Sequence, residues 1–184
     1  MDATPQRIEL AHAAGSGAPV VYLRAVEGIS AATAELSQHF RVLTFTIAHT
    51  TGVHDDAVAN AIGPHASEPV GLIADAAAAN AALRLATSRP ELVRALALIA
   101  PAVPEKVAGE FKTPVMALFG TRDAPAQIGR KMREAISGCH VIFVYDTDRD
   151  MVNQRPEAVA AILREFLIAG DRFLVTSKSG KLYP

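Results

Sequence analysis

Short apolar runs alternate with longer amphipathic stretches along this chain of 184 residues. The runs are rich in aliphatic and β-branched residues, as in buried strands, and the stretches between them repeat their apolar positions at helical spacing. Strands separated by such helices favour right-handed βαβ crossovers and a largely parallel sheet covered on both faces. We therefore predict one α/β domain over residues 1–184. The expected strands are Arg7–Ala11, Val20–Leu23, Val42–Ile47, Pro69–Ile73, Leu92–Ile99, Pro114–Phe119 and Val141–Val144, and the expected helices are Ile29–Phe40, Asp55–Ile62, an alanine-rich helix ending near Ser88, Ile128–Ile136 and Glu157–Ile168.

The residues from Arg172 to Pro184 stand apart from this alternation. Their sequence, RFLVTSKSGKLYP, is typical of a strand, a Ser-Gly turn and a second short apolar piece. We interpret this C-terminal extension as an edge hairpin or a frayed tail. The alternative is an edge that pairs with another copy of the chain, which would make a homo-oligomer.

Composition narrows the classes of function. Half of the residues are hydrophobic and a fifth are charged, which is typical of a soluble globular protein. Aromatic residues make up only 5% and Trp is absent, so few surfaces are suited to stacking on bases. The net charge of −1 argues against nonspecific binding to nucleic acid, which needs a basic excess.

Cysteine usage and hydropathy add further expectations. The single cysteine, Cys139, excludes an internal disulfide and a cysteine metal cluster, and we expect it to be a half-buried small residue rather than a nucleophile. No apolar run is long enough to span a bilayer, and acidic Asp2 stands where a signal peptide would be basic. We expect a cytoplasmic protein with no membrane partner, no nucleic-acid partner and no cofactor.

Three segments resemble the α/β-hydrolase family, in its compact esterase-like branch. VGLIADAAAANAALRLATSRPELVRALALIAPA resembles the strand, nucleophile elbow, helix and following strand of that family. TPVMALFGTRDAPA resembles the strand and loop that present the acid of the catalytic triad, and VYDTDRDMVNQRPEAVAAILREFL resembles the histidine loop and last helix. The resemblance runs from about Arg7 to Leu167. It implies a three-layer sandwich around a mostly parallel, twisted sheet.

The same resemblance implies a degenerate triad. The family's elbow is Gly-x-Ser-x-Gly, whereas residues 74–78 here read Ala-Asp-Ala-Ala-Ala, which places Ala76 at the nucleophile position. The histidine position falls on Arg149, which stays protonated and cannot act as a general base. Asp123, at the acid position, is the only triad residue retained.

Two further departures concern the pocket. The His-Gly pair that shapes the family's oxyanion hole appears as Arg24-Ala25. The family commonly inserts a helical lid between the strand ending near Ala100 and the strand starting at Pro114, where this chain has only about a dozen residues. We expect a lidless, shallow pocket. We also expect the glycine-free elbow to relax into the start of a helix, with Asp75 as its N-cap or first-turn acid.

Five charged residues are expected to lie together at the C-terminal ends of the strands, namely Arg24, Asp75, Asp123, Asp148 and Arg149. One interpretation is a salt-bridged plug that closes the former active site. The other is a site for a small polar or anionic ligand, with an arginine holding a carboxylate or phosphate. The three aspartates show no metal-binding spacing, and we expect no metal.

Two functional hypotheses follow from these patterns. The first is a noncatalytic protein with a ligand-binding or assembly role. The alternative is a hydrolase that acts on a small ester-like substrate through the non-standard residues Asp75 and Asp123, near a loop that carries His49. We interpret His49 and His54 as solvent-facing loop histidines.

Overall fold

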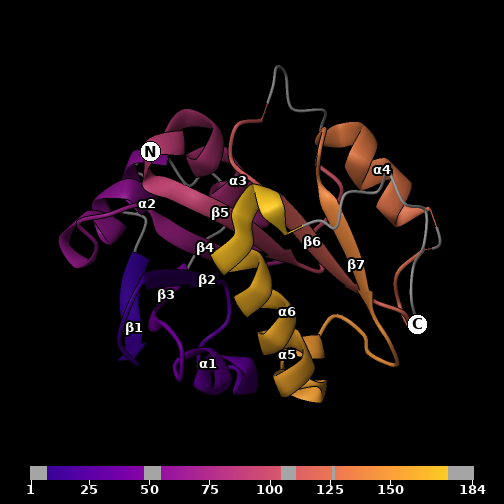
Figure 1. The fold of residues 1–184 in the computed structure, drawn as a ribbon, viewed down its shortest axis with the longest axis horizontal. Helices are drawn as coiled ribbons and strands as arrows, with labels where there is room; N and C mark the ends of the chain where they lie inside the picture. The colour runs from indigo at the N-terminus through magenta and orange to yellow at the C-terminus, as the bar shows by residue number, and fades with distance from the viewer. Residues whose placement is uncertain (1–7, 48–54, 105–110, 126, 174–184) are drawn as a thin grey trace, which may run out of the picture.

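The computed structural model describes residues 8–47, 55–104, 111–125 and 127–173. In this part of the chain seven strands form one sheet in the order β1-β3-β2-β4-β5-β6-β7 (Figure 1). β1 runs antiparallel to β3, and the other neighbouring strands are parallel, which confirms the predicted fold class. The strands are β1 Ile8–Ala14, β2 Pro19–Arg24, β3 Arg41–Ile47, β4 Val70–Asp75, β5 Val93–Ile99, β6 Val115–Gly120 and β7 His140–Val144.

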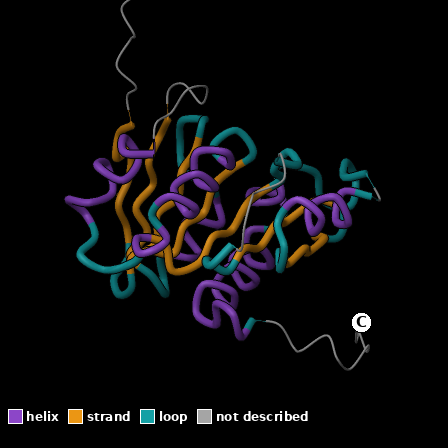
Figure 2. The backbone as a smooth tube through the Cα atoms, turned by 90° about the horizontal axis from the view of Figure 1, so that it is seen from above, coloured by secondary structure: helices purple, strands orange, loops and turns teal. Residues whose placement is uncertain are grey.

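Helices cover both faces of the sheet, as Figure 2 shows. Helices α2, α3 and α4 pack on one face, and α1, α5 and α6 pack on the other. Helix α6 crosses the near face of the sheet in Figure 1. The helices are α1 Ala31–Leu36, α2 Asp55–Ile62, α3 Ala79–Ser88, α4 Ile128–Ala135, α5 Met151–Gln154 and α6 Pro156–Ala169.

Each face of the sheet has its own apolar core. Successive side chains of a strand point to opposite faces, so in β4 Leu72 joins one buried cluster and Ile73 joins the other. The central strands β2, β4, β5 and β6 are buried along nearly their whole length because both faces are covered. This explains why those strands are continuous apolar runs in the sequence rather than alternating ones.

The predicted helix Ile29–Phe40 is wrong at both ends, because α1 covers only Ala31–Leu36. The Ser37 hydroxyl donates a hydrogen bond back to the Ala34 carbonyl (2.7 Å). Such local side-chain bonds compete with continuation of a helix. The chain then turns into β3, so the apolar positions after Leu36 belong to a turn.

The predicted first strand, Arg7–Ala11, is too short at its C-terminal end. β1 extends to Ala14 because it pairs with β3 along its length, from Ile8 opposite Ile47 to Ala14 opposite Val42. Cross-strand pairing therefore sets its length, and its own apolar pattern does not.

The C-terminal region differs from expectation in one helix. The four-residue helix α5 has no counterpart among the predicted elements. Of the C-terminal extension, the structure describes Arg172 and Phe173, and the Phe173 ring meets the Phe166 ring of α6 edge-on at 5.4 Å. The predicted hairpin and edge pairing lie outside the described residues. Within the described residues, no helix has the length and apolar character needed to cross a membrane.

The carboxyl ends of the parallel strands share one edge of the sheet, where open α/β sheets bind their ligands. Arg24 is the last residue of β2 and Asp75 the last of β4. Asp123 follows β6, and Asp148 and Arg149 follow β7. The topology thus brings the five charged residues to the same edge.

Candidate functional site

Arg24 and Asp75 lie side by side at the ends of two neighbouring strands. β2 and β4 pair in parallel with Leu23 opposite Ala74, so the next residue of each strand comes to the same place. The Arg24 Nε atom lies 4.0 Å from Asp75 Oδ2. Arg24 is only 7% exposed, and a cation so buried needs a counter-charge.

Two other groups hold the Arg24 side chain. Its Nη1 atom donates a 2.6 Å hydrogen bond to the Gly28 carbonyl, and its guanidinium carbon lies 5.5 Å from the centre of the Tyr22 ring. Burial raises the pKa of Tyr22 to about 12, so this ring stays neutral beneath the cation. The Arg24 Nε atom is buried, and no described residue is its hydrogen-bond partner.

The Asp75 carboxylate accepts hydrogen bonds from backbone amides on both sides of the site. The Ala25 N–H donates to Oδ2 (3.2 Å), and the Ala78 N–H donates to Oδ1 (3.3 Å). Burial raises the pKa of Asp75 above its ordinary value, while these amides, the Arg24 charge and the Ala77 amide act in the opposite direction. Asp75 is therefore a partly desolvated carboxylate held by amide donors.

The predicted role of Asp75 as an N-cap or first-turn acid is wrong, because α3 begins only at Ala79 and its N-cap is Ala78. Asp75 instead closes the turn before the helix, where the Ala78 N–H also donates a hydrogen bond to the backbone carbonyl of Asp75 (3.0 Å). Ala76 and Ala77 form the exposed tip of this turn. Among the described non-glycine residues, positive φ occurs at Ala100 and Asp146 and not in this turn, so the turn is unstrained, but the helix expected to start within it begins only at Ala79.

Asp123 and Arg149 form a second pair at the same edge. The Arg149 N–H donates to Asp123 Oδ2 (3.1 Å), and Arg149 Nε lies 3.6 Å from that oxygen. The Arg149 side chain is 81% exposed, so solvent screens the ion pair and it contributes little to stability. The backbone hydrogen bond, rather than the charge, fixes the position of Asp123.

Arg122 is the centre of a charged network that the sequence analysis missed. Its Nε lies 3.9 Å from Asp146 Oδ1, its Nη2 lies 3.8 Å from Asp148 Oδ2, and Nη2 also donates to Gln154 Oε1 (3.1 Å). Asp146 is further paired with Arg155 at 3.7 Å. The dense charges of the TRD and DTDRD segments are the signal that could have pointed to this network.

The loop after β7 passes directly over the end of β6. A Cβ atom on Gly120 would overlap the Thr147 carbonyl, so only glycine permits this approach. The Arg122 N–H donates to the same carbonyl (2.9 Å). Within the loop, the Asp150 N–H donates to Asp148 (2.8 Å) and holds the pKa of Asp148 below its ordinary value.

The five predicted residues thus divide into two groups. Arg24 pairs with Asp75, whereas Asp123, Asp148 and Arg149 belong to the loops after β6 and β7. No ion pair between described residues joins one group to the other. In the described part of the chain, no three His, Cys, Asp or Glu side chains are gathered as a metal site requires, so Asp75, Asp123 and Asp148 do not form one.

The remaining candidates have no contact with this edge that the structure describes. His49 and His54 lie outside the described residues. Cys139 precedes β7 and is 3% exposed, which makes it fully buried rather than half-buried as predicted. Burial raises the pKa of its thiol to about 12 and keeps it protonated.

Comparison of the fold with known proteins gives a clear result, although no protein-family model and no curated protein matches the sequence. MGS-MChE2, an α/β-hydrolase enzyme from the sediment metagenome of the Mar Chica lagoon in Morocco, superposes with a TM-score of 0.70 at 13% identity, over 90% of this chain and 96% of that chain. Est816, described as an N-acyl homoserine lactone degrading enzyme, gives 0.70 at 12% identity, over 90% and 98%. This chain has the α/β-hydrolase fold.

Other structural neighbours of the α/β-hydrolase fold agree. The thioesterase domain of the curacin biosynthetic pathway gives a TM-score of 0.66 at 9% identity, over 88% of this chain and all of that domain. Identities this low speak for the fold alone. In that fold the catalytic nucleophile occupies the turn between a central strand and the following helix. The turn between β4 and α3, with Ala76 at its tip, has this place in the topology.

Proposed function

We propose that this chain is a noncatalytic member of the α/β-hydrolase fold with a ligand-binding or assembly role. The observation that carries the proposal is the position of the Asp75 carboxylate, which accepts the Ala25 and Ala78 amides beside the turn.

The oxyanion hole of a catalytic α/β-hydrolase consists of two backbone N–H groups. One belongs to the residue after the nucleophile and the other to the loop after the neighbouring strand. By the resemblance these are Ala77 and Ala25, and both amides lower the pKa of Asp75. A carboxylate fixed at these donors competes with the negative oxygen of a transition state, which supports a loss of catalysis.

The nucleophile and the base also support this proposal. The Ala76 methyl group cannot attack a carbonyl carbon. Arg149 points into solvent, is paired with Asp123 and stays protonated, so it cannot accept a proton from a nucleophile or a water molecule. Asp123 has an orienting position with no base to orient.

The entrance to the site supports the same conclusion. β5 ends at Ile99 and β6 begins at Val115, and residues 100–104 and 111–114 of this connection are not helical. The six residues between them are fewer than two helical turns, which is too short for the family's helical lid. A polar ligand would reach Arg24 only by competing with Asp75 for it. The unpartnered Arg24 Nε atom is the donor that such a ligand would use.

The alternative function is a hydrolase that uses Asp75 and Asp123. The raised pKa of Asp75 is the observation in its favour, since partly desolvated carboxylates serve as bases or nucleophiles. Asp123, however, is bound to Arg149 in the other group of charges. The two aspartates have no contact through which they could share one reaction.

The test combines a covalent probe with a substrate assay. A fluorophosphonate probe labels activated serines whatever the natural substrate is, and we expect no labelling of the protein or of Ala76→Ser, because a hydroxyl without a base stays unreactive. We also expect no hydrolysis of p-nitrophenyl acetate above that of buffer. Hydrolysis that disappears in Asp75→Ala and persists in Asp56→Ala, an exposed aspartate on α2, would establish the alternative.

A further inference from the structure

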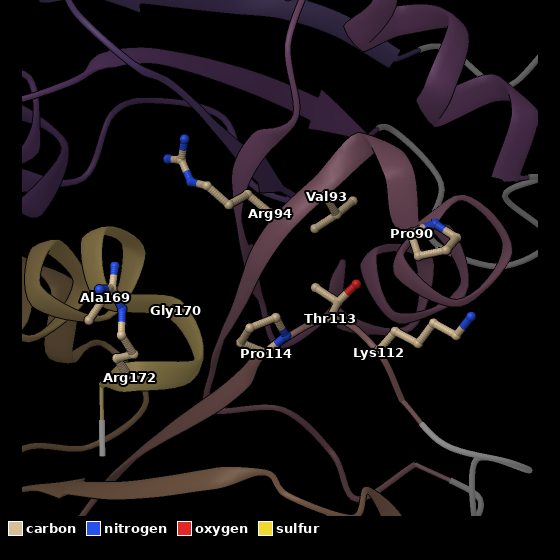
Figure 3. Close-up of a pocket in the computed structure, with 9 residues that line it drawn as sticks. All are labelled: Pro90, Val93, Arg94, Lys112, Thr113, Pro114, Ala169, Gly170 and Arg172. Carbon is tan, nitrogen blue, oxygen red and sulfur yellow. The ribbon is translucent and has the colours of Figure 1, made fainter. Parts of the chain in front are cut away.

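A second group of basic side chains lies at the opposite edge of the sheet. There a pocket of about 520 Å³ opens at the amino ends of β5 and β6, beside the end of α6 (Figure 3). Arg94, Lys112 and Arg172 line it, and none of the described residues that line it is acidic. Its volume is in the range of pockets that hold small ligands. It is separate from the edge that carries Arg24 and Asp75.

A β-bulge places Arg94 in this pocket. Val93 pairs with Val70 and Ala95 pairs with Gly71, so Arg94 is an extra residue with no partner on β4. Bulges re-aim a side chain and are frequent beside functional sites. Because of the bulge, the Arg94 side chain does not follow the regular alternation of side chains between the two faces of the sheet that the rest of β5 shows.

Gly71 makes room for the Arg94 side chain. A Cβ atom at Gly71 would lie 3.6 Å from Arg94 Nη2 and only 2.9 Å from a methyl group of Leu167. The guanidinium thus passes over a strand position that lacks a side chain. Arg94 is partly buried there, which makes its charge more costly to leave uncompensated than a charge at the surface.

The three cations of the pocket have no charged partner among the residues that the structure describes. Within the described residues Arg94, Lys112 and Arg172 form no ion pair and no side-chain hydrogen bond, although most other arginines do form one. These paired arginines are Arg24, Arg89, Arg122, Arg130, Arg149, Arg155 and Arg164. Three like charges around one cavity repel one another, and a bound anion would relieve that repulsion.

Apart from the Thr113 hydroxyl, the side chains of the rest of the described lining are apolar. Pro90, Val93 and Pro114 form the wall between the cations, and Figure 3 shows Arg94 and Arg172 on one side of the pocket and Lys112 on the other. The combination suits a ligand with a doubly charged group and a small apolar part. One guanidinium group can donate two parallel hydrogen bonds to two oxygens of a phosphate, and a phosphate has enough oxygens and charge for two arginines, which favours phosphate over a single carboxylate.

We propose that this pocket is a binding site for a small organic phosphate. The phosphate is held by Arg94 and Arg172, the apolar part rests on the proline and valine wall, and Lys112 closes the site from the other side. The proposal is independent of whether the opposite edge is catalytic, because it uses none of the same residues.

Isothermal titration calorimetry at constant ionic strength tests the proposal by measuring the dissociation constants of three probes: phenyl phosphate, inorganic phosphate and benzoate. We expect phenyl phosphate to bind more tightly than inorganic phosphate, and benzoate more weakly than phenyl phosphate. Arg94→Met should weaken phenyl phosphate binding about tenfold or more, as the loss of a charge-assisted contact predicts. Arg133→Met, which removes the same charge from the exposed side of α4, should leave binding unchanged.

Lys112→Met is the second variant, because Lys112 is exposed and its replacement is compatible with folding. It should also weaken phenyl phosphate binding. Equal affinity of Arg94→Met, Lys112→Met and the unaltered protein would overturn the proposal, as would binding of benzoate as tight as that of phenyl phosphate. If inorganic phosphate binds as tightly as phenyl phosphate, the organic part of the proposal is wrong.

Discussion

Asp75 and Asp148 lie at the same edge of the sheet, but their surroundings shift the pKa values of the two carboxyl groups in opposite directions. Asp75 is partly desolvated beside a buried arginine, and its pKa is raised above the ordinary value of 3.8. Asp148 is exposed and accepts the Asp150 N–H, and its pKa is lowered. Stability should therefore depend on pH with opposite sign at the two residues.

At Asp75 the folded state holds its proton more tightly than the unfolded state. The stability that this residue contributes is fully present below the ordinary carboxyl pKa, and it is lost as the pH rises through the raised value. An asparagine at this position does not ionise, so the Asp75→Asn variant does not lose this stability as the pH rises. We expect the free energy of unfolding of Asp75→Asn, relative to that of the unaltered protein, to increase as the pH rises above the ordinary carboxyl pKa, as measured by urea unfolding at each pH.

Asp148→Asn is the matched control for this prediction. Its folded-state pKa is depressed, so its contribution is present above the ordinary carboxyl pKa and is lost as the pH falls. The variant should be the less stable one at pH 7, and the difference should shrink toward acid. If both variants follow pH in the same direction, the opposite surroundings assigned to the two aspartates are wrong.

The site could be predicted only where one residue decides the chemistry. The family resemblance places Ala76 at the nucleophile position and Arg149 at the histidine position, and what these two side chains can do chemically follows from their residue types. The contact between the Asp75 carboxylate and the Ala25 amide could not be predicted, because it joins residues far apart in the chain. It depends on the pairing of β2 with β4 and on the turn after β4.

At the scale of elements, Gly120 at the end of β6 allows the loop after β7 to pass close to that strand. Replacement by Ala would force its Cβ against the Thr147 carbonyl, where backbone rather than a flexible side chain must move. The displacement would also break the Arg122 N–H bond to that carbonyl. We expect Gly120→Ala to lower the free energy of unfolding by at least about 2 kcal/mol.

Gly63→Ala is the control for this loop prediction. A Cβ at Gly63 would have no neighbour within 4 Å, so the change should stay within about 0.5 kcal/mol or stabilise slightly. Urea unfolding followed by circular dichroism measures both variants. A Gly120→Ala variant as stable as Gly63→Ala would contradict the close approach of the loop.

The elements themselves differ in how far the sequence predicts them. β5 and α6 were predicted within a residue of their observed ends, because a buried strand and a long amphipathic helix have strong periodic patterns. α1 and β1 were not, because a side-chain hydrogen bond ends one and pairing with β3 extends the other. α5 is too short to show a period.

At the scale of the whole molecule, the sheet separates two apolar cores, one on each of its faces. Cys139 belongs to the cluster under α2, α3 and α4, whereas Leu163 on α6 belongs to the cluster on the other face. If both cores depend on the same sheet, they should unfold together, as small domains usually do. A substitution that destabilises the core on one face should then increase the reactivity of a probe that is buried in the core on the other face.

Cys139 is suited to be that probe, because it is the only cysteine of the chain and burial raises the pKa of its thiol to about 12. A thiol reagent should modify it only when the protein opens. Leu163→Ala leaves a cavity in the opposite core at a cost of about 3 kcal/mol, which corresponds to a roughly hundredfold faster modification if opening is global. Ile168→Ala removes an aliphatic side chain that is 64% exposed on the same helix, and the rate should stay within about twofold. Equal rates in the two variants would mean that the region around Cys139 opens without α6, and the two cores would then not form one cooperative unit.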